Sequence, residues 1–273
     1  ECGVLNLPVA GGNIVSRRIR YQSRREFELG EMVYGHKIVA FVLRNEFADL
    51  FENARKEIDR RHYRHGAMKT EMAKYLPDPL SSFETTDGRC VVVMNKTEDV
   101  YSLRDVFEAL GGKVDPRHVA WMLNSVYNIA CYLDFADLTH NDISLDTLFV
   151  SPKHHSVMLY GGWWYTAPVG ARMNALPERT ISHAPPDIVR EKRADHRIDT
   201  TLIRLLGREL LGDPTGSLLT ASTPQPMMDF LRFPSRGRAL DDYRTWKETV
   251  LPACFGKPKF VKLEIPETAI WKG

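Results

Sequence analysis

The hydrophobic pattern of the chain changes its period near residues 94–102. Before this point, short apolar runs such as 36–44 and 90–94 lie between turn residues, a pattern typical of strands. After it, apolar residues recur every three or four positions, which is typical of helices. The change predicts an α+β protein, with a small antiparallel sheet in residues 25–95 and a larger helical part in residues 96–250.

Segments within the two parts are predicted from their turn and capping residues. Residues 47–76 keep a helical period, so one long helix is expected beside the sheet. Residues 80–95 indicate a β-hairpin, because two strand-like runs flank the turn sequence TDG. Asp115 and Pro116 are a typical N-cap and first helical residue, and they predict the start of a long buried helix.

Composition and cysteine spacing exclude several classes of protein. The net charge is +2, which does not point to nucleic acid or to a membrane surface, and no apolar run reaches the ~18 residues of a membrane span. The four cysteines are scattered without metal-ligand spacing, which favours a reducing compartment without a zinc site. The chain starts at Glu1 without a secretory leader or an initiator Met, which suggests a cytoplasmic protein numbered from inside a longer product. His154 and His155 are expected in a surface turn with no third metal ligand nearby.

Residues 138–150, LTHNDISLDTLFV, place His140 and Asp142 on a short connection between apolar runs. This stretch is similar to the catalytic loop of protein kinases, whose pattern is HRDxKxxN. Residues 156–164, SVMLYGGWW, resemble the strand that ends at the DFG motif of that family, and residues 182–188 resemble its APE segment. With the order of predicted elements, the resemblance implies a two-lobed protein kinase-like fold, with a small lobe of sheet and helix and a larger helical lobe.

The resemblance also implies that phosphotransfer chemistry has been lost. Thr147 and Gly161 fall at the positions of the two metal ligands, and neither supplies a carboxylate or amide oxygen. Phe41 or Val42 falls where the third strand should supply the phosphate-binding Lys. We therefore expect a pseudokinase with no bound metal and no cofactor, in which the loop is kept as architecture. The vestigial catalytic set is His140, Asp142, Thr147 and Gly161.

Asp199 lies at the start of a predicted helix and matches the Asp that supports the catalytic loop of kinases through backbone N–H groups. A simpler interpretation makes Asp199 a helix N-cap and leaves His140 and Asp142 as ordinary turn residues. The sequence GGWWY at residues 161–165 is interpreted as a turn followed by aromatic core, with a partner-binding groove as the alternative.

Three classes of function follow from these residues. The first is a catalytically inactive kinase-like protein that binds a protein partner or serves as a scaffold. The second is an atypical phosphotransferase that recruits non-standard metal ligands, with Asp142, Asp146 and Glu57 as candidates. The third is an unrelated α+β binding protein. The absence of a carboxylate at Gly161 favours the first class over the second.

The two ends of the chain, residues 1–24 and 251–273, are expected to be extensions of the two lobes. Residues 16–25, SRRIRYQSRR, include five Arg and suit an acidic partner. Tyr21 is the one aromatic residue in this stretch, too few for a base-stacking platform, so a protein partner is favoured over nucleic acid. The candidate partner residues are Arg17, Arg18, Arg20, Arg24, Arg25 and Trp271.

Overall fold

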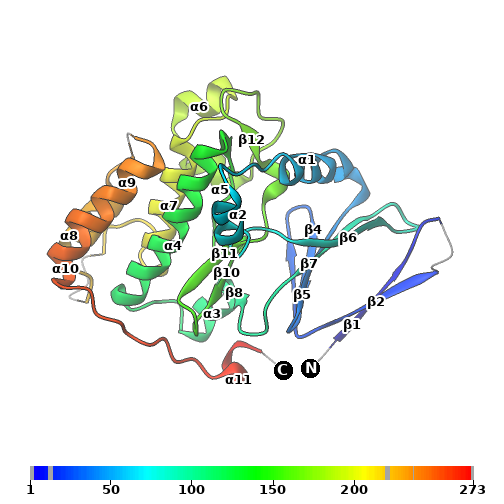
Figure 1. Cartoon of the computed structure of the whole chain (residues 1–273), viewed down its shortest axis with the longest axis horizontal. Helices are drawn as coiled ribbons and strands as arrows, with labels where there is room; N and C mark the ends of the chain where they lie inside the picture. The colour runs from blue at the N-terminus through cyan, green and yellow to red at the C-terminus, as the bar shows by residue number, and fades with distance from the viewer. Residues whose placement is uncertain (1–2, 12–14, 219–221, 236, 272–273) are drawn as a thin grey trace.

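The computed structural model describes residues 3–11, 15–218, 222–235 and 237–271, and it has an α+β fold with antiparallel sheets (Figure 1). The largest sheet has five strands in the order β3-β4-β5-β7-β6. These strands are β3 (Ser23–Phe27), β4 (Gly30–Tyr34), β5 (Ile38–Leu43), β6 (Pro79–Glu84) and β7 (Cys90–Asn95). All neighbouring strands pair antiparallel, as expected for the small sheet predicted in residues 25–95.

The two faces of this sheet pack on different layers. Tyr34 and Phe41 belong to the main core that the sheet shares with the helices. Ala40, on the opposite face, packs in a smaller cluster with Leu7 and Ile19. Those two residues come from a separate two-stranded hairpin, β1 (Gly3–Pro8) and β2 (Ser16–Tyr21). The N-terminal extension therefore contains a hairpin that covers the outer face of the sheet; residues 1–2 and 12–14 lie outside the described residues.

The single helix expected at residues 47–76 is wrong, because the chain forms two helices, α1 (Ala48–Asp59) and α2 (Gly66–Met72). The connection between them packs against the core, where Tyr63 stacks on Tyr132 with ring centroids 5.4 Å apart. His65 is then extended, and its Nδ1 accepts a hydrogen bond from the Met68 N–H at 3.2 Å, which caps α2. Tertiary packing and this cap interrupt the helical period.

The helical part begins at α3 (Leu103–Ala109) and is built around α4 (Pro116–Phe135). Asp115 caps α4 as predicted, accepting a hydrogen bond from the Arg117 N–H at 2.8 Å. Helix α7 (Arg197–Leu210) packs closely on α4 at Gly207, where an added Cβ would lie 2.9 Å from Leu123 Cδ1. The other helices are α5 (Glu178–His183), α6 (Pro186–Glu191), α8 (Gln225–Arg232) and α9 (Ala239–Thr245).

Short strands connect the helices to one another. Strand β10 (Leu148–Ser151) pairs with β11 (Ser156–Leu159) and with β8 (Tyr101–Ser102), and β9 (Leu138–Thr139) pairs with β12 (Ala167–Pro168). These pairings place residues 139–147 and 160–166 beside each other. Within the described residues, no helix combines the length and the apolar character needed to cross a membrane.

The C-terminal residues run back across the molecule (Figure 1). Helix α9 continues through a π-helical turn, Trp246–Val250, into α10 (Leu251–Phe255), so the extension predicted from residue 251 begins after this helix. An extended stretch then leads to α11 (Glu267–Ile270). Trp271 follows it and contacts Tyr34 of the sheet, with ring centroids 5.1 Å apart.

Candidate functional site

The loop at residues 139–147 is held by hydrogen bonds to a side chain of α7. The Asp199 carboxylate accepts hydrogen bonds from the backbone N–H groups of His140 at 2.7 Å and Asn141 at 2.8 Å. This is the contact predicted from the kinase resemblance. The simpler N-cap interpretation of Asp199 is wrong, because His196 occupies the N-cap position and Asp199 lies in the first helical turn. A charged acceptor is the strongest partner that buried amides can have.

His140 is fully buried and joins the loop to the two glycines that follow β11. Its Nε2 lies 2.9 Å from the Gly161 carbonyl oxygen, and its Nδ1 accepts from the Asp142 N–H at 3.3 Å. These contacts require the Nε2–H tautomer, with Nε2 as the donor. Burial lowers the pKa of His140 to about 3, so the ring is neutral at physiological pH. His140 is therefore a structural bridge.

Gly161 and Gly162 are required by close packing against the loop. Gly162 has φ of 80°, and an added Cβ would lie 2.5 Å from the His140 ring and 3.1 Å from Asp142 Cβ. An added Cβ at Gly161 would lie 3.1 Å from the Thr147 Cα and 3.4 Å from the Phe41 ring. A carboxylate at position 161 would need the backbone of the loop to move.

Thr147 does not offer its hydroxyl to a ligand. The hydroxyl donates to the Asp142 carbonyl oxygen at 2.6 Å and accepts from the Ser144 N–H at 3.0 Å. Both partners are backbone groups of the same loop, so Thr147 fixes the loop conformation, as Ser and Thr side chains commonly do in turns. The Thr147 hydroxyl, which the sequence analysis expected at a metal-ligand position, is used for internal structural contacts.

Asp142 is partly exposed, and its environment disfavours the charged form. Desolvation raises the pKa of Asp142 well above its ordinary range, and the positive charge of Arg179 opposes this shift. The Arg179 guanidinium is held by Glu209 at 2.7 Å and by the Ile143 carbonyl oxygen at 2.9 Å. Asp146 turns away to form a two-bond ion pair with Arg104, at 2.8 and 2.6 Å.

An aromatic cluster lies between the sheet and residues 160–166, and it explains the sequence GGWWY. Trp164 stacks on Phe27 with centroids 5.3 Å apart and meets Phe41 edge-on at 5.2 Å. Phe41 and Trp164 are both almost fully buried. Phe27 lies at the end of β3, so the turn between β3 and β4 rests on Trp164. The interpretation of GGWWY as turn and aromatic core agrees with this packing. Of the two residues predicted at the strand-lysine position, Phe41 packs in the main core and Val42 packs on the opposite face of the sheet.

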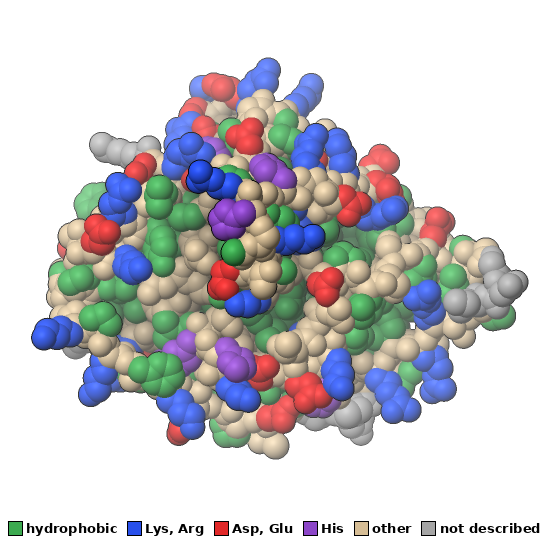
Figure 2. Space-filling view, in the orientation of Figure 1, with side chains coloured by type: hydrophobic (Ala, Val, Ile, Leu, Met, Phe, Trp, Pro, Cys, Tyr) green, Lys and Arg blue, Asp and Glu red, His purple; other side chains and the backbone are tan. Residues whose placement is uncertain are grey.

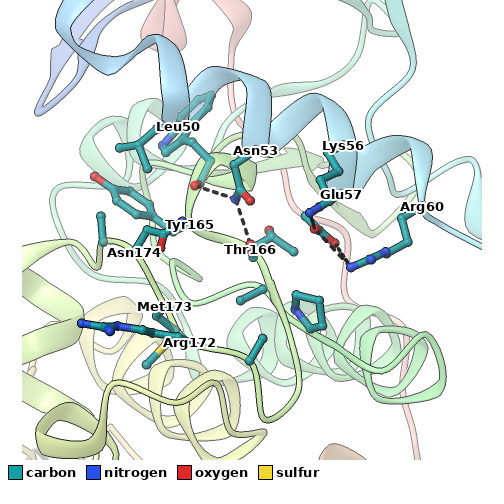
Figure 3. Close-up of a pocket in the computed structure, with 15 residues that line it drawn as sticks. Leu50, Asn53, Lys56, Glu57, Arg60, Tyr165, Thr166, Arg172, Met173 and Asn174 are labelled. Atoms are coloured by element: carbon teal, nitrogen blue, oxygen red, sulfur yellow. Dashed lines mark hydrogen bonds and ion pairs between the residues drawn. The ribbon is translucent and has the colours of Figure 1, made fainter.

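Helix α1 holds the same segment from the other side (Figure 3). The Asn53 side-chain amide donates to the carbonyl oxygens of Trp164 at 3.1 Å and Thr166 at 2.9 Å. A cavity of about 260 Å³ lies under α1 beside these bonds. Glu57 faces this cavity and is paired with Arg60 at 3.4 Å, whereas a kinase-like site would pair it with a strand lysine. The sequence analysis did not predict a role for Asn53. The feature that could have indicated it is an amide side chain on the apolar face of a predicted helix.

Two of the three alternative metal ligands are engaged in ion pairs. Asp146 is paired with Arg104, and Glu57 is paired with Arg60. Across residues 3–11, 15–218, 222–235 and 237–271, no group of three or more His, Cys, Asp or Glu side chains is arranged to hold a metal ion.

The candidate partner residues divide into two groups. Arg24 pairs with Glu31 at 2.6 Å, and Arg25 pairs with Asp105 and, at 2.8 Å, with Glu108 of α3. These two arginines, together with Trp271, stabilise the fold itself.

Arg17, Arg18 and Arg20 form the second group and line a groove of about 1030 Å³. The turn between β4 and β5 adds His36 and Lys37, which the sequence analysis did not include. Figure 2 shows Lys and Arg side chains gathered over the region of the β1–β2 hairpin. This groove, defined by Arg17, Arg18, Arg20, His36 and Lys37, is called the basic groove below.

No family model matches the sequence, and a search of curated proteins found no match. The function is therefore inferred from the site alone.

Proposed function

We propose that this chain is a protein kinase-like protein that has lost phosphotransfer and acts as a protein-binding or scaffold component. In this proposal the five-stranded sheet with α1 is the small lobe, and the part from α3 onward is the larger lobe. The contact between Asp199 and the backbone of His140 and Asn141 supports it, because kinases support their catalytic loop in the same way.

The observation that carries the proposal is the aromatic cluster of Phe27, Phe41 and Trp164. In a kinase-like fold, the space between the first strands and the DFG-like segment holds the nucleotide phosphates and magnesium. Here the same region holds three packed aromatic rings. Phosphoryl transfer depends on charge stabilisation, and apolar rings supply none.

The polar residues of the site support the same conclusion. The Thr147 hydroxyl is bonded to the backbone, Glu57 is paired with Arg60, and the pKa of Asp142 is raised by desolvation. A carboxyl group that tends to hold its proton is a poor ligand for magnesium. We infer that the loop now organises the centre of the protein.

The test is a pair of assays on the purified chain. Thermal shift with ATP, with and without magnesium, should show no magnesium-dependent stabilisation, because binding to the folded state would raise the melting temperature. Incubation with labelled ATP, magnesium or manganese and generic acceptor proteins should give no transfer above background. Transfer well above background that disappears in Asp142→Ala would establish the atypical phosphotransferase instead.

The basic groove is the surface that we propose for the partner, and an acidic segment of a protein is the occupant. Four cationic side chains and His36 line it against one acid, Glu98, which is paired with Lys37 at 3.6 Å. Ile38 and Val93 form an apolar part of the wall, which suits a peptide better than a sugar-phosphate backbone. Scattered thiols, with Cys90, Cys131 and Cys254 free, fit the cytoplasm as the proposed compartment.

A binding experiment distinguishes an acidic protein segment from a nucleic acid as the ligand of the basic groove. A fluorescent glutamate- and leucine-containing peptide should bind at low salt, and Arg18→Gln with Arg20→Gln should weaken it at least about fivefold. Arg24→Gln is the matched control, because Arg24 is committed to Glu31, and it should have little effect. A single-stranded oligonucleotide that binds more tightly than the peptide would refute the protein-partner proposal.

A further inference from the structure

A further cavity, of about 810 Å³, is lined by residues of the helical part and of the C-terminal stretch, and it shares no lining residue with the basic groove or with the loop at 139–147. One face of α4 forms one wall, and α10 with the extended residues 256–261 forms the other. The volume lies in the range of roughly 300–1,000 Å³ that is common for small-molecule sites. None of the residues used in the proposed function lines it.

Aromatic rings form the apolar wall of this cavity. His155 is stacked between Trp121, with centroids 4.5 Å apart, and Phe260, with centroids 4.4 Å apart. Phe260 is 71% exposed, although it is large and apolar, and Phe255 on α10 is also exposed. His155 itself has φ of 48°, a left-handed conformation that is unfavourable for residues other than glycine. The ring stack thus holds a strained residue at the cavity wall.

Two buried polar atoms in the wall have no partner. Asn124 Oδ1 and His155 Nε2 are inaccessible to solvent and make no hydrogen bond within the described part of the chain. Burial lowers the pKa of His155, so the ring is neutral and Nε2 can donate or accept one hydrogen bond. Unsatisfied buried groups are uncommon in folded proteins, so the wall of this cavity carries polar capacity that the described part of the chain does not use.

The charged residues around the cavity have one sign. Arg117, Lys247, Lys257 and Lys259 line it, and no carboxylate is among its described lining residues. Arg117 is paired with Asp115 at 2.8 Å, which leaves the positive charge of the three lysines, and the Lys247 ammonium lies over the Tyr243 ring, 5.7 Å from its centroid. None of these lysines forms an ion pair with a described residue. Three cations beside an apolar wall attract an anion with an apolar body.

We propose that this cavity binds an amphipathic small anion, meaning an apolar or aromatic body that carries a single carboxylate, sulfonate or phosphate. The body packs against Phe260 and Phe255, and the anionic group faces the lysines. The ligand can be an acyl-chain acid of lipid origin or a water-soluble aromatic acid, since both have this chemistry. The site is independent of the pseudokinase proposal, because it shares no residue with it.

The first test uses 8-anilino-1-naphthalenesulfonate, an aromatic anion whose fluorescence rises in apolar sites. Titration of the folded full chain should show saturable binding that weakens with salt. Phe260→Ala, and separately Lys257→Gln with Lys259→Gln, should each reduce affinity at least about fivefold, the effect of losing roughly 1 kcal/mol of contact energy. Both sites are exposed, so the variants should keep the melting temperature of the parent.

Matched controls and competitors make the test decisive. Phe233→Ala removes an equally exposed phenylalanine, 67% accessible, outside the cavity, and Lys69→Gln removes an exposed lysine on α2; neither should change the affinity. Competition by decanoate indicates the lipid source, and competition by 1-naphthoate indicates the soluble aromatic acid. Displacement by decyltrimethylammonium as strong as by decanoate would overturn the proposal, as would binding that the cavity variants and the controls alter equally.

Discussion

Replacing Asp199 tests whether the centre of the protein depends on one buried carboxylate. Asp199 is 4% exposed and accepts the N–H groups of His140 and Asn141, both of which are fully buried. Asp199→Ala leaves two buried donors unpaired, at roughly 1–3 kcal/mol each. The substitution also removes a buried charge, which offsets part of that loss, so we expect destabilisation of about 2 kcal/mol at pH 8.

The pH dependence gives this prediction its sign. Desolvation raises the pKa of Asp199 from 3.8 to about 6, although the two N–H groups oppose the shift. A folded-state pKa above the unfolded value means that the folded state holds the proton more tightly, so its contribution to stability falls as pH rises through 4 to 6. The pKa shift from 3.8 to about 6 corresponds to a total change of about 3 kcal/mol in the free energy of unfolding. Roughly half of this change falls between pH 5 and pH 8. Asp199→Ala should therefore destabilise the protein by ~1–2 kcal/mol more at pH 5 than at pH 8.

The assay is equilibrium urea unfolding of the parent, Asp199→Ala and Asp199→Asn at both pH values, followed by tryptophan fluorescence. Asp199→Asn keeps one acceptor oxygen and does not titrate, so it should cost about 1 kcal/mol at pH 8. An Ala variant as stable as the parent, or one whose destabilisation grows with pH, would refute the reasoning.

Three further changes test other parts of the structure. Gly162→Ala should destabilise by about 3 kcal/mol, because its Cβ meets His140, whereas Gly170→Ala, with a similar φ of 77° and open space, should cost ~1 kcal/mol in the same urea assay. Arg204→Ala should cost about 3–5 kcal/mol by thermal denaturation, because it leaves the buried Asp242 without its two-bond partner at 2.9 Å. The pKa of His196 is raised mainly by the Asp134 carboxylate, which lies 2.6 Å from Nδ1, so this stabilisation is present below pH ~6.5 and is lost as pH rises through the folded pKa. His196→Gln should flatten the fall in melting temperature between pH 6 and 9 relative to the parent; an unchanged slope would contradict this assignment.

Local signals were sufficient for the elements that are stabilised locally. The Asp115–Pro116 cap fixed the start of α4, and the TDG turn fixed the β6–β7 hairpin, because both depend on neighbouring residues. The break between α1 and α2 was missed because Tyr63 leaves the helix to stack on Tyr132, which lies far along the sequence. Helical periodicity does not report such a contact.

The site was predicted in part for the same reason. The Asp199 contact followed from a resemblance that covers both of its segments. Arg25 was assigned to a partner surface because its ion-pair partners, Asp105 and Glu108, lie about 80 residues away in the chain. Lys37 was not assigned to that surface because the β4–β5 turn meets the hairpin only after folding. The sequence alone does not distinguish an arginine that forms ion pairs within the fold from one that is available to a partner.

The packing around Trp271 has a mechanical consequence. Trp271 follows the extended segment that runs from α10 to α11. Its ring packs beside Tyr34 of the sheet and Tyr101 at the start of the helical part. Asn53 fastens the two parts at a second place, through its bonds to Trp164 and Thr166. Rotation of the sheet against the helices would have to break both the Trp271 ring contacts and the Asn53 hydrogen bonds. The molecule should therefore move as one rigid body, so that a partner meets a surface whose shape is already set and loses little entropy in docking to it.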